Sequence, residues 1–222
     1  MKKHLIIVAA GSGSRMGAAV PKQFLQLAGK PVLMHTMELF ADTLPDLNMV
    51  LVLSENQMQY WEDLCRTLAF HLPHHVVAGG AERFHSVLQG LNAITDTEGV
   101  VGVHDAVRPL VNKVVIERCY ATALQMGNAV PMIGLSDCLR EMVAGVSHVV
   151  DRSKYCLVQT PQCFLLNQLR EAYGQPFEPH FTDDAAVAEA AGYAIHLVEG
   201  NEENIKLTHP AHFRLAEALW QR

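Results

Sequence analysis

The chain has 222 residues, of which 50% are hydrophobic and 18% are charged, and its formal net charge is −6 at pH 7. This length fits one α/β domain with a sizeable buried core. A negative balance argues against non-specific binding to nucleic acid or to acidic membranes, because both require a basic face. No stretch approaches the ~20 apolar residues of a membrane span.

The N-terminus and the cysteines indicate which cellular location and which kinds of cysteine site to expect. Met1-Lys2-Lys3 precedes an apolar run that is too short for a secretion signal and lacks a cleavage region, so we expect a cytoplasmic protein. The five cysteines are scattered and contain no C-x-x-C pair. The pattern therefore indicates neither a disulfide framework nor a zinc site.

An apolar run over residues 4–8 leads into a turn that holds Gly11, Gly13 and Gly17. This pattern predicts a β-strand followed by a loop that cradles phosphate, because glycine lets backbone N–H groups approach an anion closely. Arg15 and Lys22 add positive charge nearby. The spacing matches neither the dinucleotide fingerprint nor a Walker loop. An ordinary strand-to-helix turn is the alternative for the glycines alone.

Runs rich in Val and Ile alternate with segments of helical period along most of the chain, which is typical of βαβ units. We predict an α/β fold with a Rossmann-like, mostly parallel sheet flanked by helices, in a single domain over residues 1–222. Further strands are expected over residues 49–53, 75–78, 100–104, 129–133, 157–160 and 195–198. Helices are expected over residues 31–40, 56–69, 82–94, 113–126, 165–172, 183–191 and 211–221, with Thr182 capping the helix over 183–191.

The alternation fails between residues 134 and 152. Two short strand-like runs, 139–143 and 146–150, flank Ala144-Gly145, which predicts a β-hairpin. An isolated hairpin is marginally stable in water, so this arm should lean on another surface. That surface is either a second subunit or the arm's own domain.

Ligands of open parallel sheets bind beyond the carboxyl ends of the strands, so the residues there are the first candidates. Gly80, Arg83 and Ser86 follow one strand, where they suit a base or an anion. Asp105 ends another, and a carboxylate beside a triphosphate is a natural ligand for Mg²⁺. The alternatives are a glycine-rich helix entry with a surface Arg83, and a buried Asp105–Arg108 pair without a ligand.

Several motifs carry a family resemblance. Gly11-x-Gly13-x-Arg15-Met16-Gly17 followed by Pro21-Lys22-Gln23-Phe24 resembles the signature of nucleotidyltransferases that activate sugar and polyol phosphates. The stretches His104-Asp105-Ala106-Val107-Arg108-Pro109 and Asn204-Ile205-Lys206-Leu207-Thr208 narrow the resemblance to the 2-C-methyl-D-erythritol 4-phosphate cytidylyltransferases. The similarity runs from about Leu5 to the C-terminal helix.

The resemblance implies a reaction of CTP with methylerythritol phosphate, with Mg²⁺ as cofactor, in a homodimer joined through the arm. It assigns catalysis to Arg15 and Lys22, and the metal to Asp105. It implies a nucleotide site formed by Ala9, Ala10, Gly11, Gly13, Gly80, Arg83, Ser86, Asp105, Ala106 and Lys206. It implies a site for the polyol phosphate formed by Arg108, Arg152, Thr160, Thr182 and Lys206.

One position departs from the family pattern. Cys138 stands where the family commonly has a threonine that helps to hold the substrate phosphate, and a thiol is a weak donor. Two other functions stay open. A ribitol-5-phosphate cytidylyltransferase would share the opening loop, and a non-catalytic nucleotide-binding module is disfavoured because Arg15, Lys22 and Lys206 are all present.

Overall fold

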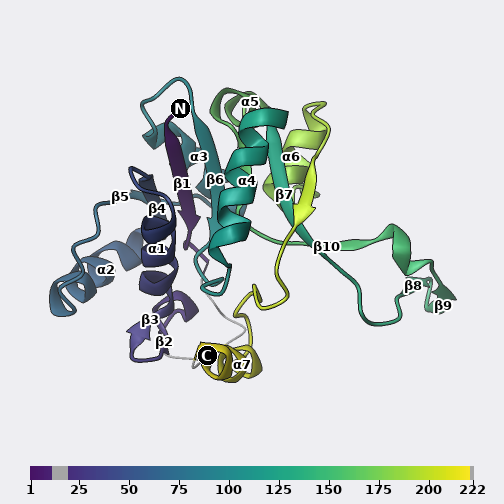
Figure 1. The fold of residues 1–222 in the computed structure, drawn as a ribbon, viewed down its shortest axis with the longest axis horizontal. Coiled ribbons are helices and arrows are strands. Elements are labelled where there is room, and N and C mark those ends of the chain that lie inside the picture. Colours follow the sequence, from purple (N-terminus) through teal and green to yellow (C-terminus); the bar gives the residue numbers. More distant parts are fainter. Residues whose placement is uncertain (12–19, 221–222) are drawn as a thin grey trace.

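The protein is described by a computed structural model that covers residues 1–11 and 20–220. An eight-stranded sheet forms its centre, in the order β10-β7-β11-β6-β1-β4-β5, with β12 beside β7 (Figure 1). One half is parallel throughout and consists of β1 (Lys3–Val8), β4 (Asn48–Leu53), β5 (His75–Ala78) and β6 (Val100–Asp105). The carboxyl ends of these strands therefore meet at one edge, as the α/β prediction requires.

The other half of the sheet is mixed. It consists of β7 (Asn128–Gly134), β10 (Cys156–Val158), β11 (Gln162–Leu165) and β12 (Leu197–Glu199). β12 runs parallel to β7, whereas β10 runs antiparallel to it and β11 runs antiparallel to both β6 and β7. β11 thus joins the two halves in the opposite direction to β6.

Helices cover both faces of the sheet, and the side chains of β1 show why. Leu5 and Ile7 pack into a cluster with α1 (Val32–Thr43), α2 (Glu55–Thr67) and α4 (Lys113–Met126). Ile6 points to the other face, into a cluster with α3 (Arg83–Ala93), α5 (Leu166–Ala172) and α6 (Asp184–Ala190). All three side chains are fully buried, as expected for a strand covered on both faces.

A third, smaller cluster holds the C-terminal helix α7 (Pro210–Trp220). It unites Leu27, Val107 and Ala216, so α7 packs on the short hairpin of β2 (Gln26–Leu27) and β3 (Lys30–Pro31). A 3₁₀ turn, η2 (Lys22–Phe24), precedes this hairpin. Figure 1 places β2, β3 and α7 together, at the end of the molecule where the parallel strands terminate.

The predicted hairpin is confirmed. β8 (Arg140–Val143) and β9 (Val146–Val149) pair with each other, and every residue of both strands is exposed. Ala144 and Gly145 have φ of 48° and 83°, which are the positive values that a tight hairpin turn requires at both central positions. The 3₁₀ turn η3 (Arg152–Lys154) follows, and the whole arm projects away from the sheet (Figure 1).

Several details of the predicted elements need correction. The strand expected over 157–160 ends at Val158, and β11, which follows it, was missed because its four residues run directly into α5. The β2–β3 hairpin was also missed. The cap of α6 is Asp183 rather than Thr182, since the Asp183 side chain accepts a hydrogen bond from the Ala186 N–H at 2.9 Å.

Within residues 1–11 and 20–220, no helix is long and apolar enough to cross a membrane.

Candidate active site

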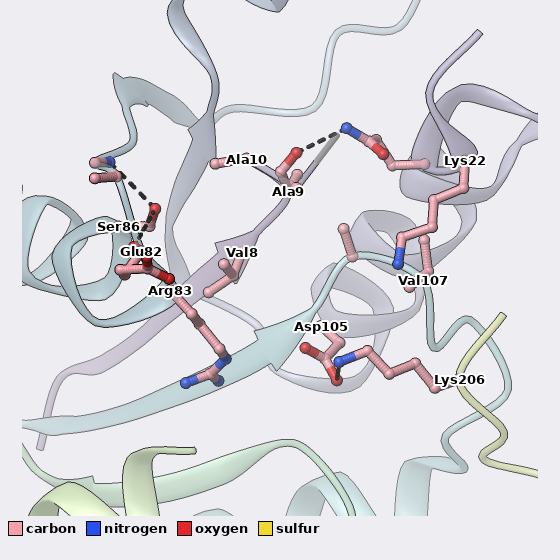
Figure 2. Close-up of a pocket in the computed structure, with 15 residues that line it drawn as sticks. Val8, Ala9, Ala10, Lys22, Glu82, Arg83, Ser86, Asp105, Val107 and Lys206 are labelled. Atoms are coloured by element: carbon pink, nitrogen blue, oxygen red, sulfur yellow. Dashed lines mark hydrogen bonds and ion pairs between the residues drawn. The ribbon is translucent and has the colours of Figure 1, made fainter. Parts of the chain in front are cut away.

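A cavity of about 520 Å³ opens where β1 and β6 end (Figure 2). It gathers every residue of the predicted nucleotide site that the structure describes. Gly13 and the predicted catalytic Arg15 lie outside the described residues. The cavity is lined by Val8, Ala9, Ala10, Gly11, Lys22, Gln23, Gly80, Ala81, Glu82, Arg83, Ser86, Asp105, Ala106, Val107 and Lys206.

Asp105 is the electrostatic centre of the cavity. Its carboxylate oxygen Oδ2 lies 3.0 Å from Lys206 Nζ and 3.1 Å from Arg108 Nε. Burial on its own would raise the pKa of Asp105, but the positive charges of Lys206, Arg83 and Arg108 outweigh it and hold the pKa well below its usual range. The carboxylate is therefore ionised at neutral pH. The ion pair between Asp105 and Arg108 that the sequence suggested is present, and Lys206 is a second cation in contact with the same carboxylate.

His104 helps to hold the backbone around Asp105. The ring is fully buried, and its Nε2 lies 3.1 Å from the carbonyl oxygen of Arg108. Its Nδ1 lies 3.0 Å from Thr160 Oγ1. The same Thr160 oxygen accepts a hydrogen bond from the Asp105 N–H at 3.2 Å. Burial lowers the pKa of His104 to about 4, so the imidazole is neutral. The backbone on both sides of Asp105 is thus held in place.

Lys22 enters the cavity from the η2 turn, and its ammonium group points inward (Figure 2). The next residue explains how this turn is held. Gln23 is buried, and its amide donates hydrogen bonds to the Ala9 carbonyl oxygen at 2.7 Å and to Gln57 Oε1 at 2.8 Å. Because Ala9 directly follows β1, the first bond ties the turn that carries Lys22 to the end of that strand, and the second ties it to α2.

Arg83 begins α3 and is held across the sheet edge by α6. Its guanidinium forms two hydrogen bonds to the Asp184 carboxylate, at 3.0 and 2.6 Å. Asp184 is fully buried and also accepts a hydrogen bond from the Tyr173 hydroxyl at 2.7 Å. Burial disfavours the charged guanidinium, but Asp184 more than compensates and raises the pKa of Arg83 above its usual value. Arg83 is therefore held in an ion pair with a buried carboxylate, and only 25% of its side chain is exposed.

Two glycines, Gly79 and Gly80, pack closely between β1 and α3, and Gly80 lines the cavity. A Cβ atom on Gly79 would lie 2.7 Å from Ala10 Cβ and 2.8 Å from Ser86 Oγ, and one on Gly80 would lie 2.3 Å from His85 Cβ. Neither position has room for a side chain. The Gly80 N–H donates to Ser86 Oγ at 3.2 Å, and the Ser86 hydroxyl donates to the Glu82 carbonyl oxygen at 3.2 Å. Gly80 and Ser86 both line the cavity.

The predicted site for the polyol phosphate is spread more widely. Arg108 and Lys206 line a second hollow of about 520 Å³ next to the arm's root. Thr160 is buried behind Asp105. Thr182 is exposed on the loop before α6. Arg152 lies on the arm, where its Nη1 donates to the Ser136 carbonyl oxygen at 2.6 Å.

Two supporting contacts were not predicted from the sequence. Asp184 holds Arg83 although 101 residues separate them, so no local signal could reveal the pair. Gln159 is buried beside Asn204, whose Nδ2 lies 3.3 Å from Gln159 Oε1 and donates to the Thr160 carbonyl oxygen at 2.9 Å. Asn204 belongs to the stretch 204–208 that resembles the family, and this resemblance was the sequence signal that could have indicated the contact.

The cavity fits a divalent cation bound through Asp105. Both cationic side chains approach Oδ2, whereas Oδ1 points away from Lys206 (Figure 2). Among the described residues, no group of three or more His, Cys, Asp or Glu side chains could hold a metal ion. Mg²⁺ is usually bound by one or two carboxylates together with substrate phosphates and water, and a single ionised carboxylate matches that pattern.

Comparison with known proteins decides the family. The sequence model of the family described as "IspD: 2-C-methyl-D-erythritol 4-phosphate cytidylyltransferase" matches residues 3–222. The chain belongs to this family. IspD proteins that carry this enzyme name include one from Bacteroides thetaiotaomicron, which is 49% identical, with 99% of this chain and 100% of that protein covered. One from Porphyromonas gingivalis is 48% identical, with 98% and 97% covered.

Solved IspD structures share the fold. The 2-C-methyl-D-erythritol 4-phosphate cytidylyltransferase from Thermus thermophilus aligns with a TM-score of 0.78 at 32% identity, and both chains are covered completely. The IspD structure from Francisella tularensis aligns with a TM-score of 0.80 at 28% identity, also over both full chains. The prediction of a Rossmann-like α/β fold is therefore confirmed.

Proposed function

We propose that the protein joins CTP and 2-C-methyl-D-erythritol 4-phosphate, giving 4-diphosphocytidyl-2-C-methyl-D-erythritol and pyrophosphate for isoprenoid synthesis. The observation that carries this proposal is the cavity in which Lys22, Lys206 and Arg83 surround the ionised Asp105, in a chain that matches the IspD family over residues 3–222. A non-catalytic module would not need such a concentration of charge. The relatives reported above are named for methylerythritol phosphate, which favours it over ribitol phosphate.

In the proposed reaction, a phosphate oxygen of the polyol phosphate attacks the α-phosphorus of CTP. The bond from this phosphorus to the bridging oxygen breaks, and pyrophosphate leaves with that electron pair. The attacking oxygen is already anionic, so the step needs no general base. Catalysis then depends on alignment of the reacting groups and on stabilisation of the charge that moves to the leaving group.

The cations of the cavity are suited to this task. Lys22 is held by its turn against the end of β1 and points at the position proposed for the triphosphate. Lys206 approaches from the opposite wall, through its contact with Asp105. Arg15, which we expect to act with Lys22, lies outside the described residues. Mg²⁺ bound at Asp105 would neutralise part of the charge on the triphosphate oxygens.

We place the nucleoside against the wall of Ala10, Gly80 and Ser86. All three residues line the cavity, and their small size leaves room for a flat base there. The assignment to cytosine rests on the family. The cytoplasmic location and the single domain over residues 1–222 stay predictions.

We propose Arg108, Arg152, Thr182 and Lys206 as contacts of the polyol phosphate. Arg108 and Lys206 share one hollow, and Arg152 lies on the arm, where it donates to the Ser136 carbonyl oxygen. The arm exposes 57% of Val146 and 79% of Val149, a large apolar exposure for a free hairpin. We therefore propose a homodimer in which the arm packs on the second subunit and contributes Arg152 to its site.

A pyrophosphate-release assay tests the proposed function. The purified protein is mixed with CTP and Mg²⁺, and then with methylerythritol phosphate or ribitol 5-phosphate in separate reactions. Release with methylerythritol phosphate alone supports the proposal. If pyrophosphate is released faster with ribitol 5-phosphate, that compound is the substrate instead. If the protein binds CTP but releases no pyrophosphate in either reaction, it is a nucleotide-binding module without this activity.

A further inference from the structure

Lys22 stands on a turn that is too short to hold its own conformation. The turn η2 has three residues, and its backbone hydrogen bonds run from the Phe24 N–H to the Pro21 carbonyl oxygen at 2.9 Å and from the Leu25 N–H to the Lys22 carbonyl oxygen at 3.3 Å. Among the described side chains, none caps its N-terminus. Because the first turn of a helix is unfavourable to form by itself, contacts from outside must hold η2 in place.

The helix α2 contacts both residues that follow Lys22 in the turn. Gln23 Nε2 donates a hydrogen bond to Gln57 Oε1 at 2.8 Å. The ring of Phe24 stacks beside the ring of Trp61, with 6.1 Å between the ring centres. All four of these contacting side chains are buried. None of the described residues that line the cavity belongs to α2, so this helix supports the turn from outside the site.

The partners of the Gln23 amide determine its orientation. The Ala9 carbonyl oxygen can only accept, so the Gln23 atom that lies 2.7 Å from it is the amide nitrogen. The same nitrogen meets Gln57, which must therefore present its oxygen. Both N–H hydrogens of the amide are then used, one toward the end of β1 and one toward α2. Two acceptors on different elements fix the amide, whereas a single acceptor would leave it free to rotate.

Trp61 joins α2 to a further segment of the chain. Its Nε1–H donates a hydrogen bond to His74 Nε2 at 3.0 Å. His74 Nδ1 lies 2.7 Å from the Leu72 carbonyl oxygen, so Nδ1 carries the ring proton and Nε2 is the acceptor. The helix is therefore attached to the segment before β5 as well as to the turn. Gln57 thus presents its oxygen from a helix that is itself held in place.

We propose that Gln57 is a positioning residue, which fixes Gln23 and thereby holds the Lys22 ammonium group where the triphosphate binds. Lys22 and Gln23 are neighbours in one turn, so a rotation of that turn would move both side chains. The proposal rests on the proposed function, which gives Lys22 its role in stabilising charge. A misplacement of about 1 Å in an active site can lower the rate about 100-fold. The proposal assigns a part in catalysis to α2, outside the motifs that resemble the family.

The first test compares Gln57→Met with Gln59→Met. Methionine is similar in length to glutamine but is only a weak acceptor, so Gln57→Met leaves one Gln23 N–H without its partner. Gln59 is exposed on the same helix, and Gln59→Met is the matched control. We expect Gln57→Met to lower kcat about 10- to 100-fold and to change KM for methylerythritol phosphate by less than about twofold, with the wild-type kcat in Gln59→Met. An unchanged kcat in Gln57→Met would overturn the proposal.

A double-mutant cycle with Lys22→Ala separates the positioning of Lys22 from a general loss of stability. If Gln57 acts through Lys22, adding Gln57→Met to a protein that lacks the lysine should lower kcat little further. Losses that multiply would contradict the proposal, because Gln57 would then act on another group. Should Gln57→Met fail to fold, Gln57→Asn draws the acceptor back by one methylene and keeps the amide, with the same expected results.

The proposal and the proposed function fail in different ways. If the wild type releases no pyrophosphate with either polyol phosphate, the proposed function fails, and amide hydrogen exchange then tests the contact without any activity. Gln57→Met should make the Phe24 and Leu25 amide hydrogens exchange faster than in the wild type, and Gln59→Met should not. Equal exchange in all three proteins would show that α2 does not hold the turn, and would overturn the proposal.

Discussion

The Asp105 corner, formed by His104, Asp105, Arg108, Thr160 and Lys206, contrasts with the arm over residues 135–155. In the corner, the polar side chains are paired with groups of the same chain, and Asp105 is only 7% exposed. In the arm, every strand residue is exposed, and the hairpin's backbone pairs only with itself. The corner is therefore specified by one chain, whereas the arm is the part for which we propose a contact with a second subunit.

The largest effect that we expect tests the chemistry of the corner. Lys22→Ala removes a cation aimed into the cavity, and loss of one such preorganised group costs on the order of 10²- to 10³-fold in kcat. Steady-state kinetics and thermal melting measure the outcome. Lys113→Ala, at an exposed lysine that begins α4, is the control. Undiminished turnover in a natively melting Lys22→Ala protein would remove Lys22 from the mechanism.

The pH dependence of stability tests the buried carboxylate itself. The pKa of Asp105 in the folded protein lies well below its ordinary value of 3.8, so Asp105 stabilises the fold above that value. This contribution is lost as the pH falls and the unfolded chain binds a proton that the folded chain does not. We expect the melting temperature of the wild type to drop more steeply below about pH 4 than that of Asp105→Asn. Parallel profiles of the two proteins would count against a strongly stabilised carboxylate.

The next prediction concerns the arm. Val146→Asp places a charge on a side chain that is already 57% exposed, so it should hardly change the stability of a single subunit. It should dissociate the proposed dimer, which analytical ultracentrifugation would measure. Val114→Asp, at an equally exposed valine on α4, is the matched control. A wild type that sediments as a monomer would show that the arm is not the subunit contact.

The smallest effect that we expect concerns Cys138, which is exposed on the arm. Cys138→Thr restores a hydroxyl donor where the family commonly has one. A single hydrogen bond to a charged group contributes about 1.5 kcal/mol or more, and exposure reduces this value. We expect KM for methylerythritol phosphate to fall several-fold at most, with kcat unchanged, in steady-state assays. A rise in KM would mean that the thiol suits this site better than a hydroxyl.

The same contrast explains what could be predicted from the sequence. The strand over residues 4–8 and the position of Asp105 were recognisable because buried parallel strands are apolar runs whose carboxyl ends share an edge. The hairpin was recognisable from its Ala144-Gly145 turn. Each of these features depends on residues that are close together in the chain.

The missing parts depend on distant residues. β11 has four residues and becomes a strand only because β6 and β7 flank it. The bond between Arg83 and Asp184 joins residues 101 positions apart. The hydrogen bond between the Thr160 hydroxyl and the His104 ring joins residues 56 positions apart. No local pattern encodes these three contacts.

The direction of β11 bears on how this architecture can evolve. Because β11 is antiparallel to β6, its first residue, rather than its last, arrives beside the ligand edge. Cys156 also pairs with Gly134, so the two ends of the intervening segment are adjacent. The segment over residues 135–155 is therefore an insertion whose two ends lie side by side in the sheet. A change of length within it would leave its two paired ends, and the sheet strands that they belong to, in the same positions.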